Sequence, residues 1–236
     1  MRGTVWCAGV LGLVLAAGGL APVAAAELTG CDLPKVDNFV LFVDQSGSMY
    51  QQHAEVGEVK EVLAKRTLLE LNQEVPSKFC CLNSAVYAFA PFEEVKASYV
   101  YDQGSLATRI GWIPDSQPVS LRLTPMASGF EELTPVVADL KGKTAVIIVS
   151  DGGSNTGGDP VEAARALVAA KPGTCLHVVS IADDEHGREV NAELAKITPE
   201  CKSVEARDVL GSGPKMQQFS RDVFCISRPL SPRRGG

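Results

Sequence analysis

Two apolar runs that each end in an aspartate are the strongest pattern along the chain. The first, within residues 37–44, is FVLFV followed by Asp44, and the second, within residues 143–153, is AVIIV followed by Ser150 and Asp151. Short uninterrupted runs of this kind are typical of strands that are buried on both faces of a parallel sheet. Both aspartates are therefore expected at strand ends.

The rest of the chain alternates between strand-like and helix-like patterns. Residues 84–92 and 95–102 predict a hairpin. Thr124 as N-cap and Pro125 at the first helical position predict a helix start, and Pro135 is expected to divide that segment into two helices. Further strands are predicted at 175–182 and 202–206, and further helices at 56–69, 106–112, 160–171, 188–197 and around 216–223.

This alternation predicts an α/β fold of the Rossmann-like, doubly wound type. We expect a mostly parallel six-stranded sheet with helices on both faces. Right-handed crossovers then place the carboxyl ends of the parallel strands at one edge of the sheet, where such folds bind ligands. Asp44 and Asp151 are expected at that edge.

The N-terminus has the pattern of a secretory signal peptide over residues 1–26. Arg2 precedes an apolar run over 5–20, and small residues stand at Ala24 and Ala26. The run is shorter than the roughly 20 residues that span a bilayer, which disfavours a membrane anchor. We expect an N-terminal segment at 27–36, a single domain at 37–225 and a disordered, Pro- and Gly-rich tail at 226–236.

A lipid anchor at Cys31 is the alternative for this end of the chain. LTGC at 28–31 has the residue types of a bacterial lipoprotein box, but Glu27 separates it from the apolar run. Loss of the signal peptide removes Cys7 and leaves six cysteines, whereas lipidation of Cys31 leaves an odd number, which is rare in exported proteins.

The six remaining cysteines are expected at the sheet edge opposite the two aspartates. Five of them precede predicted strands, and Cys225 ends the last helix. We predict a disulfide between Cys175 and Cys201. The other two bridges are expected to join Cys31 and Cys225 each to one of Cys80 and Cys81.

Charge excludes one class of partner. The chain carries a formal net charge of −6, which becomes −7 when Arg2 leaves with the signal peptide. Binding of nucleic acid needs a basic face, so no nucleic-acid partner is expected. No segment after the signal peptide is long and apolar enough to span a membrane, and the protein is expected in the periplasm or outside the cell.

Five oxygen-bearing side chains are expected together at the functional edge. Asp44, Ser46 and Ser48 occupy alternate positions after the first strand, Asp151 follows another strand, and Thr124 precedes a helix. Hard oxygen donors without Cys or His suit Mg²⁺ or Mn²⁺ rather than zinc. The sequence therefore predicts a site for one of these two metals.

This set resembles the von Willebrand factor A (vWA) family and its metal-ion-dependent adhesion site, written D-x-S-x-S, then Thr, then Asp. The resemblance implies the strand order C-B-A-D-E-F. It implies that Ser46, Ser48 and Thr124 contact the metal, while Asp44 and Asp151 act largely through water. It also implies an open coordination position, which an Asp or Glu of a partner protein fills. The expected partner-binding rim comprises Tyr50, Gln51, Met126, Gly152, Gly153, Ser154 and Asn155.

Two other functions for the same residues are disfavoured. Ser46 and Ser48 alone are compatible with simple helix capping, but capping does not account for Thr124 and Asp151. A metal-dependent phosphohydrolase with Asp44 as nucleophile needs D-x-D, and Ser46 stands at the second position. The chain also lacks the G-x-S-x-G pattern of serine hydrolases. We therefore expect a binding protein rather than an enzyme.

Overall fold

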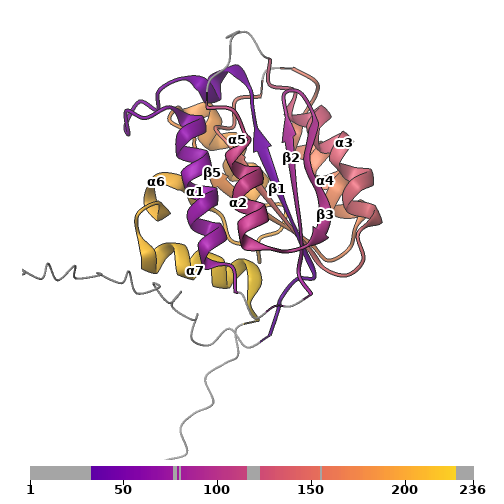
Figure 1. The fold of residues 1–236 in the computed structure, drawn as a ribbon. Helices are drawn as coiled ribbons and strands as arrows, with labels where there is room; N and C mark the ends of the chain where they lie inside the picture. The colour runs from indigo at the N-terminus through magenta and orange to yellow at the C-terminus, as the bar shows by residue number, and fades with distance from the viewer. Residues whose placement is uncertain (1–32, 77–78, 80, 116–122, 155, 227–236) are drawn as a thin grey trace, which may run out of the picture.

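The computed structural model describes residues 33–76, 79, 81–115, 123–154 and 156–226. The predicted signal peptide, the predicted lipoprotein box, Cys80, Asn155 and the tail beyond Ile226 lie outside these residues. Figure 1 shows a central sheet with helices on both sides. In chain order the elements are β1 Asn38–Asp44, a 3₁₀ helix η1 Gly47–Tyr50, α1 Lys60–Glu74, β2 Asn83–Phe89, β3 Glu93–Val100, α2 Gln103–Gly111, α3 Met126–Asp139, β4 Thr144–Ser150, α4 Pro160–Ala170, β5 Thr174–Ser180, α5 Glu185–Ala195, β6 Val204–Glu205, α6 Ala206–Val209 and α7 Gly213–Phe224.

The sheet has six strands in the order β3-β2-β1-β4-β5-β6. All neighbours pair in parallel except β2 and β3, which form the predicted antiparallel hairpin. The order is the one that the family resemblance implies, so the predicted fold class is confirmed. Because β1 and β4 are neighbours, their carboxyl ends lie side by side at one edge of the sheet.

Alternate residues of β1 build two separate cores. Phe39, Leu41 and Val43 pack with α1, α2, α6 and α7 on one face. Val40 and Phe42 pack with α3, α4 and α5 on the other. The two-residue period of the strand therefore explains why the central run is apolar throughout, since both of its faces are covered.

The first helix begins later than the sequence predicted. Residues 51–59 form a loop, closed by a bridge between Gln52 and Val59, and α1 begins at Lys60. Val56, which the periodicity placed on the buried face of a helix, is 42% exposed. Gly57 has a φ of +73°, a left-handed conformation that a continuous helix does not contain.

The predictions for α3 were wrong in two details. Pro125 rather than Thr124 is the N-cap, so the helix starts one residue later than expected. Pro135 lies inside one continuous helix instead of dividing two. Phe130, Leu133 and Val137 are fully buried on both sides of the proline, and this packing holds the helix together although the proline removes one backbone hydrogen bond.

The predicted disulfide between Cys175 and Cys201 is confirmed. It joins the start of β5 to the segment before β6, at the edge opposite the carboxyl ends of the strands. Cys225 is also disulfide-bonded, and Cys81 is exposed. The bridges predicted to involve Cys31 and Cys80 fall on residues outside the described part of the chain.

The described segment before β1 is fastened to the end of α7 at that same edge. The backbone amide of Lys35 donates to the Phe224 carbonyl at 2.8 Å, and Ile226 donates to Leu33 at 3.1 Å. Within the described ranges, no helix has both the length and the apolar character needed to cross a membrane.

One acidic side chain lies inside the core at the start of α1. Glu61 is fully buried, and neither carboxylate oxygen has a hydrogen-bond partner among the described residues. Burial, with a smaller contribution from the charge of Asp44, raises the pKa of Glu61 to about 9. The side chain is therefore a neutral carboxylic acid at pH 7.

Removal of the Cys175–Cys201 bridge should destabilise the fold. The bridge closes a loop with a sequence separation of 26. Loss of a loop of this size should lower the free energy of unfolding by about 3 kcal/mol, chiefly because the unfolded chain gains freedom. Urea denaturation of Cys175→Ala/Cys201→Ala against the wild type measures the loss. An unchanged midpoint would show that the bridge is not a structural constraint.

Glu61 should make the protein less stable as the pH rises. The unfolded chain ionises Glu61 above its ordinary pKa of 4.5, whereas the folded protein keeps it protonated up to about 9. Stability is therefore lost between these values as the pH increases. Glu61→Gln should match the wild type at pH 4 and exceed it by a few kcal/mol at pH 8, as urea denaturation in the presence of chelator would show. Equal stability at pH 8 would contradict a buried neutral acid.

Candidate metal centre

The turn after β1 brings two serine hydroxyls together. The backbone amide of Ser46 donates to Asp44 Oδ1 at 2.8 Å, which folds the chain back over the strand end. η1 follows, and Ser46 Oγ then lies 3.1 Å from Ser48 Oγ. Ser46 is fully buried and Ser48 half-buried. The alternate spacing seen in the sequence thus places three oxygen-bearing side chains in one turn.

The loop after β4 places Asp151 beside this turn. Asp151 Oδ1 accepts a hydrogen bond of 3.1 Å from the amide of Gly153. A methyl group at Gly153 would lie 3.1 Å from Asp151 Oδ1 and 3.4 Å from Ser48 Oγ. The Asp151 carboxylate and the Ser48 hydroxyl therefore flank the same glycine, although they belong to different strand ends.

Thr124 comes to the same edge through the start of α3. The loop after Asp151 packs against this helix start, since a methyl group at Gly157 would lie 3.4 Å from the Pro125 side chain. Thr124 directly precedes Pro125 and is buried, with 2% of its surface exposed. The five predicted ligands therefore come from three segments. Asp44, Ser46 and Ser48 belong to the end of β1 and the turn after it, and Asp151 follows β4. Thr124 belongs to the segment that packs on the loop after β4.

The two carboxylates of the site oppose each other electrostatically. Asp44 is fully buried, and burial together with the charge of Asp151 raises its pKa to about 7. Hydrogen bonds from Ser150 and Ser46 oppose this shift; the Ser150 hydroxyl donates to Asp44 Oδ2 at 2.6 Å. A buried acid beside a second carboxylate is a place where a bound cation is stabilising.

A lysine and a third aspartate complete the charged edge, and the sequence analysis missed both. Lys60 Nζ lies 3.1 Å from Asp151 Oδ2 and 2.5 Å from Asp183 Oδ1. Asp183 follows β5 along the chain, so the strand-end rule that identified Asp44 and Asp151 also applies to it. No pattern in the sequence identified Lys60, because its position depends on the conformation of the loop before α1.

The donor set fits a divalent cation of the hard class. Its oxygens come from two carboxylates and three hydroxyls, which suits Mg²⁺ or Mn²⁺. Ser46, Ser48 and Thr124 would supply neutral oxygens, and Asp44 and Asp151 the negative charge. Lys60 already balances part of that charge. The residues present therefore fit the ion, with one cationic group built in beside it.

The predicted rim is only partly at the surface. Gln51 is exposed, and Tyr50, Gly153 and Ser154 are half-buried. Gly152 is buried. Met126, the first residue of α3, has no exposed surface because it packs in the core, which disfavours its assignment to the rim. Asn155 lies outside the described residues.

His53 is held by hydrogen bonds within its own loop. It is 2% exposed, and its Nδ1 accepts hydrogen bonds from the amides of Glu55 at 3.2 Å and Val56 at 3.3 Å. Burial lowers its pKa. The imidazole therefore organises the loop over residues 51–59.

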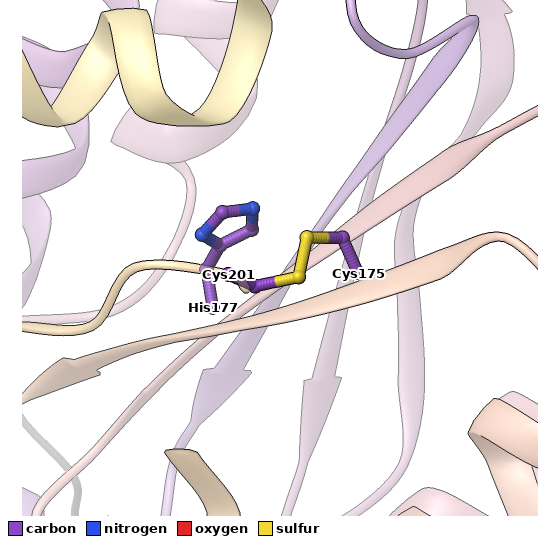
Figure 2. A group of neighbouring side chains, drawn as sticks. All are labelled: Cys175, His177 and Cys201. Atoms are coloured by element: carbon purple, nitrogen blue, oxygen red, sulfur yellow. A yellow bond between two sulfur atoms is a disulfide. The ribbon is translucent and has the colours of Figure 1, made fainter. Parts of the chain in front are cut away.

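A second group of potential ligands lies at the opposite edge of the sheet. Figure 2 shows the imidazole of His177 beside the disulfide, and one ligand atom from each of Cys175, His177 and Cys201 lies within 4.8 Å of the others. The two sulfur atoms are bonded to each other, so they offer no thiolate to a metal. His177 Nδ1 bonds the Lys202 carbonyl at 2.7 Å, and burial lowers the pKa of His177 to about 4. In this oxidised form the group is structural.

Comparison with solved structures identifies proteins with the same fold. No protein-family model matches the chain, and no curated protein sequence matches it. Its structure is similar to a conserved hypothetical protein, BatB, from Bacteroides thetaiotaomicron, with 18% identity, a TM-score of 0.59 and coverage of 79% of this chain and 96% of that one.

Two further structures extend the similarity to named domains. The vWF domain of the type V pili tip protein Mfa5 from Porphyromonas gingivalis is 10% identical, with a TM-score of 0.57 and coverage of 77% and 93%. The manganese-loaded TRAP protein of Plasmodium vivax is 14% identical, with a TM-score of 0.53 and coverage of 80% and 74%. Identities this low show shared architecture rather than shared function. With its six-stranded sheet and strand order, the chain has the fold of von Willebrand factor A domains.

Proposed function

We propose that this protein is an exported, metal-dependent adhesion domain. It holds one Mg²⁺ or Mn²⁺ at Asp44, Ser46, Ser48, Thr124 and Asp151, and it binds a partner protein through an Asp or Glu of that partner. The observation that carries the proposal is the convergence of the paired serine hydroxyls with Asp44 and Asp151, which belong to neighbouring strands.

The chemistry of the donors explains why such an ion would bind a partner's acid. Hydroxyl oxygens are neutral and leave much of the charge of a dication uncompensated. A carboxylate from outside then gains a strong electrostatic bond by completing the coordination shell. Tyr50, Gln51, Gly153 and Ser154 lie around the site, where contacts with the rest of the partner would add specificity.

The environment of Asp44 argues against the phosphohydrolase alternative. A carboxylate nucleophile needs an oxygen that can reach the substrate. Asp44 is fully buried, its Oδ1 accepts from the Ser46 amide, and its Oδ2 accepts from the Ser150 hydroxyl. His53, the nearest imidazole in the sequence, has its Nδ1 engaged by its own loop. These contacts favour binding over catalysis.

Two of the structural neighbours agree with this proposal. One is the vWF domain of a pilus tip protein, and another is a protein that was solved with manganese bound. Together with the signal peptide expected at residues 1–26, they favour a role at the cell surface or in the periplasm. The partner's identity does not follow from the fold.

The metal site predicts a defined calorimetric result. The wild type should bind one Mg²⁺ or Mn²⁺ per chain, and Asp151→Ala should weaken that binding by roughly 10–100-fold, the range found when carboxylates that act behind the direct ligands are removed. Asp139→Ala, which removes an exposed carboxylate at the far end of α3, should leave it unchanged. Equal metal affinity in Asp151→Ala and the wild type would refute the assigned ligands.

The adhesion mechanism predicts which peptides the protein selects. Peptides from a random display library that bind in Mg²⁺ and elute with chelator should all contain an essential Asp or Glu. Replacement of that residue by Asn or Gln should abolish binding, since an amide cannot balance the charge of the ion. Ser46→Ala/Ser48→Ala should capture none of these peptides.

Two outcomes would contradict the adhesion mechanism. One is chelator-sensitive binding of peptides that have no acidic residue. The other is hydrolysis of a phosphate ester by the purified protein that requires metal and disappears in Asp44→Asn, which would establish the enzyme instead.

A further inference from the structure

Lys60 places a permanent positive charge against one of the proposed metal-binding carboxylates. Its ammonium lies between Asp151 Oδ2 and Asp183 Oδ1, at 3.1 and 2.5 Å. Only 5% of the Lys60 side chain is exposed, so the ion pair is poorly screened by solvent. Both side chains that it contacts are carboxylates, which favour its charged form. The lysine is therefore charged.

The loop over residues 51–59 fixes the lysine in this position. The Lys60 amide donates to the Gln51 carbonyl at 3.0 Å, and the bridge between Gln52 and Val59 closes the loop. The amide of Ala54 donates to Asp183 Oδ2 at 2.8 Å. Asp183 thus accepts a hydrogen bond from the loop backbone with one carboxylate oxygen and forms an ion pair with the lysine through the other.

Two arginines hold the tip of the same loop. Glu55 pairs with Arg188 on α5 at 2.6 Å and with Arg207 on α6. These pairs are exposed and individually weak, but they add to the buried contacts of Asp183. The loop is therefore attached both to the site and to the helices behind it, which limits how far Lys60 can withdraw.

We propose that Lys60 is a tethered cation that competes with the divalent metal for Asp151, and that Asp183 sets the strength of this competition by sharing the ammonium. The inference rests on the proposed metal site. Asp151 Oδ1 already accepts from the Gly153 amide, and Oδ2 faces Lys60, so both oxygens are engaged before an ion arrives. A dication at the site meets the repulsion of the nearby ammonium, and the burial of Lys60 limits how far solvent weakens that repulsion.

A different role for Lys60 has the opposite consequence. If the lysine served mainly to hold Asp151 in the orientation that the metal needs, its removal would weaken metal binding. If it competes, its removal strengthens metal binding. The sign of the change therefore separates the two roles without any assay of partner binding.

The test is calorimetric titration of Mg²⁺ and Mn²⁺ into three proteins. Lys60→Met, which keeps the length and the packing of the side chain, should bind the metal about tenfold more tightly than the wild type, the effect expected from removal of one nearby charge. Asp183→Asn should bind it more weakly than the wild type, because the ammonium then interacts with Asp151 alone.

Lys65→Met provides the matched control. Lys65 is also on α1 and also largely buried, but it pairs with Asp115 and the Ile113 carbonyl, away from the three aspartates of the site. Its removal should leave metal affinity unchanged. Thermal unfolding in chelator checks that each variant is folded before titration.

The outcomes distinguish this inference from the proposed function. Metal affinity in Lys60→Met that equals or falls below that of the wild type would overturn the competition while leaving the metal site intact. Absence of metal binding in both the wild type and Lys60→Met would overturn the site itself. If Lys60→Met does not fold, a stronger affinity in Asp183→Asn than in the wild type would also refute the competition.

Discussion

The repulsion between two buried carboxylates at neighbouring strand ends is the constraint around which this edge of the protein is arranged. Burial and, to a smaller extent, the nearby charge of Asp151 both disfavour the ionised form of Asp44. Ser150, the Ser46 amide and Lys60 each oppose it with a hydrogen bond or a charge. Each of these groups is in place only because β1, β4 and the loop before α1 meet in this register.

The backbone at this edge approaches so closely that two positions accept only glycine. Gly152 has a φ of +76°, and a methyl group on it would overlap the backbone of Gly187 at the start of α5. A methyl group on Gly187 would in turn overlap the Asp151 carbonyl. Through this contact the loop after β4 packs directly on the start of α5, next to the segment that carries Asp183. The two glycines therefore position charged side chains that they do not touch.

Local spacing was enough to predict the strands and the oxygen-bearing turn, because both depend on near neighbours in the chain. Ser46 and Ser48 follow Asp44 within four residues, and parallel topology alone places Asp151 at the same edge. Lys60 could not be predicted, since its position depends on a loop whose conformation is fixed by contacts with Asp183 and with α5 and α6, which are distant in the sequence.

The errors in the predicted helices have a related cause. Pro135 favours a helix end locally, but the core on both sides of it keeps α3 continuous. The apolar period that includes Val56 looks helical, yet the Gly57 turn and the tethering of the loop to α5 and α6 decide that segment. In both segments, tertiary packing overrode a correct local preference.

The charges around the proposed metal site indicate what a lysine beside Asp151 would do in an adhesion domain. Asp151 and Asp183 contact the ammonium of Lys60, and Asp44 adds a carboxyl group whose pKa of about 7 leaves it only partly ionised. Glu61 adds no charge, because its raised pKa keeps it protonated at pH 7. Without Lys60 the carboxylates would compensate more of the charge of a bound dication and reduce its attraction for a further acid. If Lys60 competes with the metal as proposed, it weakens metal binding while leaving more of the charge of the ion available to a partner's carboxylate.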